Sequence, residues 1–250
     1  MSELVVLSPH LDDAVLSCGG RIAHDVAAGR TVTVVTLFTA DEPAEPPSRL
    51  ARDLRRWWKL PHGVMAARRS EDLAACAALG ARAEHWDLPE APYRLDPAGS
   101  PLYATLSALF GEVSHHDDRF VEALAARLAP LAGRGEILTP LGVGGHVDHR
   151  VVRRAAERAG VAALYYEEFP YTEWKWFALR RALGRPDDWR AEPLALSADE
   201  VEARVGAIAR YRSQVPVMFR NEGRLRRQVR RAVRRSGGER LWRKAGGAPR

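Results

Sequence analysis

The chain has 250 residues, 46% of them hydrophobic, and a net charge of +6 at pH 7. This length and composition are typical of a globular protein that buries its own core. The two cysteines, Cys18 and Cys76, have no CxxC partner, so the sequence supports neither a disulfide framework nor a cysteine-ligated metal site. Residues 220–250 carry twelve Lys and Arg against two Glu, a local charge of +10, so residues 1–219 sum to −4. The basic character therefore belongs to a C-terminal tail.

The amino-terminal apolar run, residues 4–7, is too short for a signal peptide and follows no basic segment. A membrane-spanning helix needs about 18 or more consecutive apolar residues. The sequence has no such run, so we expect no membrane span. Together with the two unpaired cysteines, these features favour a cytoplasmic protein.

The first 38 residues predict a strand, a helix and a second strand. Residues 4–8 are a short apolar run that ends near a proline, which is typical of a buried strand. Residues 14–28 have the pattern of a helix, with Asp12 and Asp13 placed at its N-terminus. Residues 31–38 are rich in Val and Thr and predict the second strand. We expect a βαβ unit with a right-handed crossover.

The rest of the chain continues the alternation of strands and helices. Residues 39–65 are rich in Pro, Trp and charge, and we expect an active-site loop with room for one short helix. Beyond it, the sequence predicts helices over residues 67–79, 118–131 and 149–159, and strands over residues 83–88, 136–139 and 162–166. This order predicts a mostly parallel sheet with helices on both faces, whose ligands bind beyond the carboxyl ends of the strands.

The first group of chemically active residues is His10, Asp12 and Asp13, directly after the first predicted strand. Zinc prefers imidazole and carboxylate ligands, and two ligands three residues apart on a strand-to-helix turn can converge on one ion. The adjacent carboxylate can then serve as a base toward a water molecule. The simpler alternative is that one aspartate caps the helix and His10 is an ordinary loop residue.

The second group is His146, Asp148 and His149, in a glycine-rich segment that follows a predicted strand and opens a helix. Two histidines beside an acid offer a third metal ligand and a spare imidazole for acid–base chemistry. The alternative is a surface helix with Asp148 as its N-cap. Both groups follow strand ends, so together they predict a metal site of two imidazoles and one carboxylate beside an acid–base pair.

Several motifs of the chain resemble the LmbE-like (PIG-L) N-acetylglucosaminyl deacetylase family. The resemblance runs from residue 4 to about residue 216. Its specific part is the ordered pair SPHLDDAVLSCGG (residues 8–20) and GGHVDHR (residues 144–150). Weaker support comes from the R-x-x-E…L-G segment of residues 68–80 and from YRSQ at residues 211–214.

This resemblance implies a Rossmann-like α/β fold and one metal ion, zinc, or iron in some members. By motif position, the metal ligands are His10, Asp13 and His149. Asp12 is then the general base, His146 is a protonated group that stabilises the oxyanion or protonates the leaving amine, and Asp148 orients His146. The implied reaction is hydrolysis of an N-acetyl group, which gives acetate and a free amine.

The sequence departs from the family pattern at two positions. Ala14 follows Asp13 where many members have Glu, and Gly144 stands where some deacetylases have Tyr. We name Tyr93, Tyr171 and Trp174 as candidate replacements for that phenol and as candidate substrate-binding residues. Arg68 is a further candidate for contact with substrate hydroxyl or phosphate groups. The alternatives are an exposed i,i+3 pair of Arg68 with Glu71, and core or lid packing for the aromatic residues.

The basic tail has apolar residues at helical spacing, at positions 225, 229, 232 and 233, with arginines between them. We expect a deacetylase domain over residues 1–219 and a separable helical tail over residues 220–250, whose deletion leaves the catalytic chemistry intact. The tail could meet an anionic surface or pack on the acidic domain. We do not expect specific nucleic-acid binding, because no aromatic residues alternate with the arginines.

The sequence thus predicts a metal-dependent amidohydrolase that removes an N-acetyl group from an acetamido sugar or a sugar-containing small molecule. One alternative is hydrolysis of another amide, in a natural-product or thiol-conjugate intermediate. Another is a non-catalytic binding protein that uses the basic tail.

Overall fold

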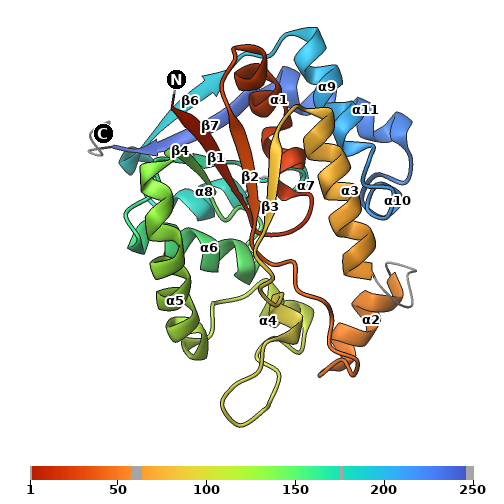
Figure 1. The fold of residues 1–250 in the computed structure, drawn as a ribbon, viewed down its shortest axis with the longest axis vertical. Coiled ribbons are helices and arrows are strands. Elements are labelled where there is room, and N and C mark those ends of the chain that lie inside the picture. Colours follow the sequence, from red (N-terminus) through yellow and green to blue (C-terminus); the bar gives the residue numbers. More distant parts are fainter. Residues whose placement is uncertain (1, 58–63, 175–176, 246–250) are drawn as a thin grey trace.

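The amino-terminal apolar run forms β1 (Glu3–Ser8), which lies in the interior of a seven-stranded sheet. The computed structural model describes residues 2–57, 64–174 and 177–245, and its strand order is β3-β2-β1-β4-β5-β7-β6 (Figure 1). Four strands run parallel to β1 in one continuous block: β2 (Val32–Thr36), β3 (Arg82–His85), β4 (Gly135–Pro140) and β5 (Leu164–Tyr166). The predicted Rossmann-like, mostly parallel sheet is confirmed.

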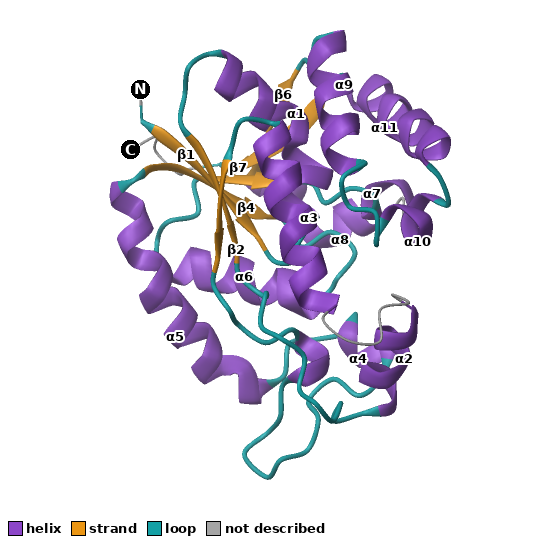
Figure 2. Cartoon of the chain, turned by 45° about the vertical axis from the view of Figure 1, so that its right-hand side comes forward, coloured by secondary structure: helices purple, strands orange, loops and turns teal. Residues whose placement is uncertain are grey.

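Helices cover both faces of the sheet (Figure 2). Side chains of a strand alternate between faces, so Leu4 and Val6 of β1 join one apolar cluster and Val5 and Leu7 join the other. The first cluster is covered by α1 (Asp13–Ala27), α3 (Val64–Ala78) and α9 (Ala198–Ile208), and the second by α5 (Asp118–Leu128) and α6 (Val147–Arg158). β1 is therefore buried on both faces, as its continuous apolar sequence predicts.

The connections contain shorter elements, and the 39–65 segment does include a helix, α2 (Arg49–Trp57). The other short α-helices are α4 (Leu106–Leu109), α7 (Tyr171–Trp174), α8 (Ala178–Leu183) and α10 (Val215–Phe219). Turns of 3₁₀ helix lie at Ala91–Tyr93, His115–Asp117, Ala129–Gly133 and Pro186–Asp188. Among the described residues, no helix is both long enough and apolar enough to span a membrane.

The C-terminal segment is built into the sheet, which corrects the expected boundary between residues 219 and 220. The predicted helix is present as α11 (Glu222–Ser236), but it leads into β7 (Glu239–Lys244). β7 lies between β5 and β6 (Trp189–Leu194) and is antiparallel to both. A strand bonded on both sides is an interior part of the sheet, so the described part of this segment, residues 220–245, is not a separable tail.

The first residue of β7 also fastens the segment to α1. The buried carboxylate of Glu239 accepts hydrogen bonds from the backbone N–H groups of Gly20 and Arg21, at 2.8 and 2.7 Å. Arg204 of α9 pairs with Glu239 at 3.1 Å and donates to the carbonyl of Leu16. Backbone groups in the middle of α1 thus have partners from the C-terminal part of the chain.

Candidate metal and catalytic centre

The loop after β1 is held in a tight turn by its own polar groups. Ser8 Oγ donates to the carbonyl of His10 at 2.7 Å and accepts from the backbone N–H of Ala14 at 3.0 Å. Asp12, the N-cap residue of α1, has φ of 142°, a region that residues other than glycine rarely adopt. The turn places the side chains of His10 and Asp13 together at the N-terminus of α1.

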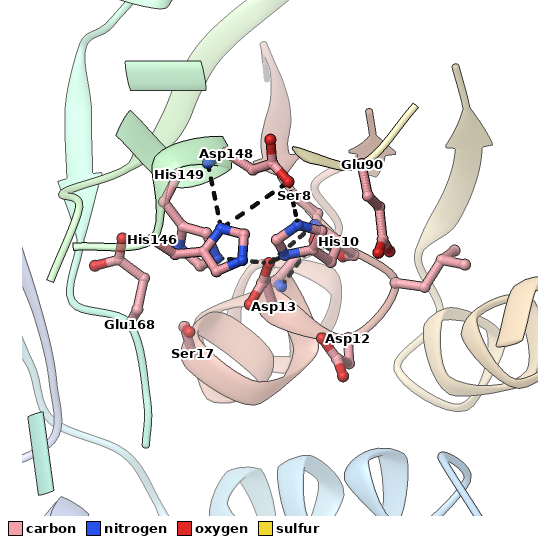
Figure 3. A network of polar contacts seen from close by, with 12 residues as sticks. Ser8, His10, Asp12, Asp13, Ser17, Glu90, His146, Asp148, His149 and Glu168 are labelled. Carbon is pink, nitrogen blue, oxygen red and sulfur yellow. Dashed lines mark hydrogen bonds and ion pairs between the residues drawn. The ribbon is translucent and has the colours of Figure 1, made fainter. Parts of the chain in front are cut away.

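The loop after β4 brings the second group of residues to the same edge of the sheet. Gly144 and Gly145 adopt φ of 91° and 80°, which glycine tolerates without steric cost. His146 then caps α6, and its Nδ1 accepts a hydrogen bond from the backbone N–H of Asp148 at 3.2 Å. His149, in the first turn of α6, points back toward Asp13 (Figure 3).

The two groups converge on one carboxylate oxygen. Asp13 Oδ2 lies 3.1 Å from Nδ1 of His10 and 3.2 Å from Nε2 of His149. It also accepts the backbone N–H of His10 at 2.9 Å. One ring nitrogen from each of His10, His146 and His149 lies within 4.8 Å of the other two. Residues more than 130 positions apart in sequence therefore form one compact set of potential metal ligands (Figure 3).

The set fits a divalent metal ion. Nδ1 of His149 lies 3.2 Å from Oε1 of the buried Glu168, while its buried Nε2 has no partner with hydrogen-bond geometry among the described residues. A metal-binding histidine commonly gives one ring N–H to a carboxylate and keeps the other nitrogen for the ion. Imidazole and carboxylate donors suit zinc and related metals.

Opposite charges within the set compensate for burial. Burial lowers the pKa of His149, but the carboxylates of Asp13 and Glu168 outweigh it and raise that pKa to about 9. Burial raises the pKa of Asp13, but His149 and His10 outweigh it and hold that pKa well below its usual range. Without a metal, the site therefore favours an ionised Asp13 between the protonated rings of His10 and His149. A metal ion can replace the protons of the two rings and supply the positive charge itself.

Asp12 has a different environment from Asp13. Burial and the neighbouring Asp13 carboxylate raise the pKa of Asp12 to about 8, while Arg68, 3.8 Å away, lowers it. A buried carboxylate with a pKa near neutrality suits proton transfer at physiological pH.

Asp148 forms a second buried cluster behind His10. Its Oδ2 lies 3.0 Å from Nε2 of His10 and accepts the backbone N–H of Ala91 at 2.9 Å. Its Oδ1 accepts from Arg94 at 2.5 Å. Burial raises the pKa of Asp148, but Arg94 and His10 outweigh it, so that pKa lies well below its usual value. This lowered pKa favours the ionised form of Asp148 in its contact with the His10 ring.

Comparison with known proteins agrees with these observations. The model of the PIG-L family, described as GlcNAc-PI de-N-acetylase, matches residues 5–160, which include both motifs. The chain belongs to the PIG-L family.

Relatives of this PIG-L protein include named deacetylases. It is 29% identical over 232 residues to 2'-N-acetylparomamine deacetylase of Niallia circulans, covering 80% of this chain and 84% of the relative. It is 28% identical over 263 residues to 1D-myo-inositol 2-acetamido-2-deoxy-alpha-D-glucopyranoside deacetylase of a Mycobacterium strain, covering 87% and 77%. The solved zinc-inhibited form of teicoplanin deacetylase Orf2 has a TM-score of 0.79 and 25% identity, covering 99% of this chain and 100% of that chain.

Sequence reasoning assigned no role to two residues that contact this PIG-L centre, Glu168 and Arg94. Glu168 follows β5, and the rule that ligands lie beyond the carboxyl ends of strands could have drawn attention to it. Arg94 follows a 3₁₀ turn and lies 54 positions from Asp148, so nothing in the local sequence indicates their contact. Sequence reasoning also assigned Asp148 to His146, whereas its carboxylate lies 3.9 Å from that ring and 3.0 Å from His10.

Arg68 has a different position from the one expected. Its side chain is only 4% exposed, so it lies neither at the rim of the site nor in an exposed pair with Glu71. It donates to the carbonyl of Leu11 at 3.1 Å and pairs with Glu90 at 3.3 Å. Helix α3 is packed against the β1–α1 loop, which explains why an arginine in this helix faces inward.

The aromatic candidates lie at different places. Tyr171 lies beside the centre: a Cβ added to Gly144 would be 2.6 Å from the Tyr171 ring, and that ring lies 5.9 Å from the His149 ring. Tyr93 is half-buried and donates to Glu42 at 3.3 Å. The side chain of Trp174 lies outside the described residues. Of the two whose side chains are described, Tyr171 is the one that lies against Gly144, the glycine found in place of a family tyrosine.

Proposed function

We propose that this protein is a metal-dependent N-deacetylase that hydrolyses the acetamido group of a sugar or a sugar-containing small molecule. The observation that carries the proposal is the convergence of His10 and His149 on Asp13, with the carboxyl group of Asp12 beside them. The family supports the same chemistry, because its relatives are deacetylases of acetamido sugars and of sugar-bearing antibiotics.

The metal would be held by His10, Asp13 and His149, and we propose zinc. Glu168 and Asp148 would fix the two imidazoles from behind, as carboxylates commonly do for metal-binding histidines. When bound, zinc would polarise the acetyl carbonyl and lower the pKa of a nearby water molecule.

Asp12 would take the proton from the attacking water. Its raised pKa makes it a stronger base than an ordinary aspartate, and Arg68 keeps part of its population ionised. The strained backbone at Asp12 fixes this carboxyl group at the start of α1.

His146 would act on the opposite side of the reacting carbon. Its Nδ1 accepts a backbone hydrogen bond, so the proton of the neutral imidazole lies on Nε2. Burial and the nearby His10 hold the pKa of His146 well below its ordinary value. We therefore propose that the neutral Nε2–H donates a hydrogen bond to the oxyanion, rather than the protonated imidazole suggested by the sequence. The leaving amine would take the proton that Asp12 removed from the water.

The test is metal analysis followed by an assay of amine release. Purified protein is stripped with a chelator, reloaded with zinc or iron, and incubated with N-acetylglucosamine glycosides. We expect one metal ion per chain, loss of turnover on stripping and recovery on reloading. No stoichiometric metal, together with unchanged turnover in Asp12→Ala, would contradict the proposed mechanism.

A further inference from the structure

Helix α6 presents chemically different residues on its two sides. Its first turn supplies His149 to the metal centre, while Arg150, Arg153 and Arg154 lie on an outer face at helical spacing. This outer face lines a cavity of about 410 Å³ between α6 and α8 (Figure 1 shows the two helices). None of the catalytic residues proposed above lines this cavity.

The cavity adjoins the metal centre through the loop after β4. Gly144 and Gly145, the two residues before His146, form part of its wall. Phe110 forms another part, and its ring stands edge-on to the His146 ring at 5.2 Å. A ligand that extends from His146 past Phe110 would therefore enter the cavity.

The cavity is strongly basic. Four arginines line it, against the single carboxylate of Glu157. Arg153 is already used by the fold, because it donates to the carbonyls of Leu141 and Ala182 at 2.7 and 2.9 Å and pairs with Glu157 at 3.1 Å. The one acidic residue in the lining, Glu157, is paired with Arg153. The lining therefore offers no carboxylate to the other three arginines, Arg150, Arg154 and Arg181.

Two of these arginines, Arg154 and Arg181, are exposed and incompletely paired. Arg154 makes no hydrogen bond or ion pair within the described part of the chain, and Arg181 reaches only Glu112, at 3.9 Å. Arg150 and Arg154 are one helical turn apart, where like charges repel each other. A bound anion would relieve this repulsion, since guanidinium groups bind carboxylates and phosphates in a matching planar geometry.

Glu112 shows that an anion is stabilised beside these arginines. Its side chain is 69% exposed, yet one carboxylate oxygen lies 3.0 Å from Arg150 and 3.9 Å from Arg181. The hydrogen bond from Arg150 and the charges of Arg154 and Arg181 lower the pKa of this carboxyl group. A flexible surface glutamate can yield its place to a ligand anion.

We propose that the cavity between α6 and α8 is a subsite for a carboxylate or phosphate group on the aglycone of the substrate. The inference rests on the proposed function for the position of the acetamido group. Along α6, residues 146 and 154 are separated by about 12 Å at 1.5 Å per residue, more than one sugar ring spans. The anion therefore belongs to the group attached to the acetamido sugar.

The walls indicate that the aglycone is partly apolar. Phe110, Phe177 and Ala178 line the cavity beside the arginines, and Phe177 is 52% exposed. Exposed aromatic residues at a concave site commonly contact ligands. An aromatic ring that carries an acidic group matches both the apolar and the basic parts of the wall.

The test compares three aryl glycosides of 2-acetamido-2-deoxyglucose that carry 4-carboxyl, 4-phosphate or neutral 4-carboxamide groups. We expect kcat/KM of the zinc enzyme to be about three- to tenfold higher for an anionic than for the neutral substrate. In Arg154→Gln with Arg181→Gln, this ratio should fall toward one. Raised salt should reduce it in the unmodified protein.

The matched control is Arg180→Gln, because Arg180 is exposed on α8 but does not line the cavity. This variant should keep the ratio. A ratio of one in the unmodified protein, or an equal loss in the Arg180 variant, would overturn the subsite. The relative values for carboxylate and phosphate identify the preferred anion.

A binding experiment separates this proposal from the proposed function. Calorimetry measures the affinity of the Asp12→Asn protein for the 4-carboxyl and 4-carboxamide glycosides, without need of turnover. Tighter binding of the carboxylate that is lost with Arg154 and Arg181 supports the subsite even if no amine is ever released. Equal binding of both glycosides contradicts it even if deacetylation is observed.

Discussion

At the amino ends of β1 and β4, carboxylates are held by arginines, whereas at the carboxyl ends of the same strands carboxylates are held by histidines. Glu3 at the start of β1 accepts two hydrogen bonds from Arg134, at 3.0 Å each. Glu136 near the start of β4 pairs with Arg30 at 3.0 Å and with Arg21 at 3.2 Å. These groups lie at the surface, with 16% and 26% of the two glutamate side chains exposed.

At the carboxyl ends, the corresponding contacts are deeply buried. The side chains of His149, Glu168 and Asp148 are fully buried, and each lies in a contact between an imidazole and a carboxylate. Arginine remains protonated at every accessible pH, so its ion pairs cannot exchange a proton. Imidazole exchanges its proton near neutral pH and can bind a metal instead, so the same type of carboxylate becomes part of a reactive site.

The largest effect that we expect comes from the carboxyl group placed to move a proton. Asp12→Asn should lower kcat by about 10²- to 10⁴-fold, the usual contribution of a general base. Metal content should remain, because Asp12 is not a proposed ligand. Steady-state assays with metal analysis measure both, and Glu3→Gln at the opposite edge is the control. Full activity in Asp12→Asn would contradict the view that the carboxylates at the carboxyl ends of the strands are reactive and those at the amino ends are structural.

Arg94 lies at the carboxyl ends of the strands, beside the histidines of the metal centre. Its replacement tests whether this arginine stabilises the buried carboxylates around it. It donates to Asp148 and, at 3.0 Å, to Asp117, which are both buried. Arg94→Met should reduce the free energy of unfolding by about 3–5 kcal/mol, because two buried carboxylates lose their cation.

Urea unfolding measures this loss of stability. Arg127→Met is the control, because Arg127 is exposed and stacks on Trp86 at the surface. We expect less than about 1 kcal/mol for that variant. Similar losses in both variants would show that burial does not distinguish the two arginines.

Glu168→Gln tests the carboxylate behind a proposed metal ligand. Glu168 accepts the backbone N–H of Gly142 at 2.6 Å and that of Val143 at 2.9 Å, and it faces Nδ1 of His149. Glu168 uses both carboxylate oxygens for these contacts. A glutamine side chain has only one accepting oxygen, so it cannot make all of them. Zinc affinity, measured by competition with a chelator, should fall about 10- to 100-fold.

The adjacent Glu167→Gln is the matched control for this variant. Glu167 pairs with Arg240 and accepts from Trp242 at 2.7 Å, away from the histidines. Its zinc affinity should equal that of the unmodified protein. A fall of the same size in the control would assign the effect to the loop rather than to the contact with His149.

The smallest effect concerns the ion pair at the amino edge. The hydrogen bond from Arg134 lowers the pKa of Glu3, so this pair stabilises the fold above the pKa of the unfolded chain. That stabilisation is lost as the pH falls through the lower pKa of the folded state. Glu3→Gln should cost about 0.5–1 kcal/mol at pH 7 and less below about pH 4.

Urea unfolding at several pH values gives the comparison for Glu3. Glu45→Gln is the control, because Glu45 is exposed and makes no ion pair with any described residue. Its cost should not change with pH. A cost for Glu3→Gln that is constant from pH 7 to below pH 4 would mean that the ion pair does not contribute.

Much of the fold could be predicted from short patterns. The strand of residues 4–8, the helix that follows it and the strand of residues 136–139 are present within a few residues of their expected bounds. Continuous apolar runs between turn signals are typical of strands buried on both faces. β7 could not be predicted in the same way, because Arg240, Arg243 and Lys244 give it the composition of a solvated segment. Its pairing depends on β5 and β6, which lie far away in the sequence.

By itself, the sequence determined the family and the residues that one tight turn can bring together. His10 with Asp13, and His146 with His149, are each three residues apart, so local backbone geometry fixes their proximity. The tertiary structure decided which partners lie behind them: Glu168 for His149, Asp148 and Arg94 for His10, and Arg68 for Asp12. Those contacts depend on the order and register of the strands, which join positions that no local pattern relates.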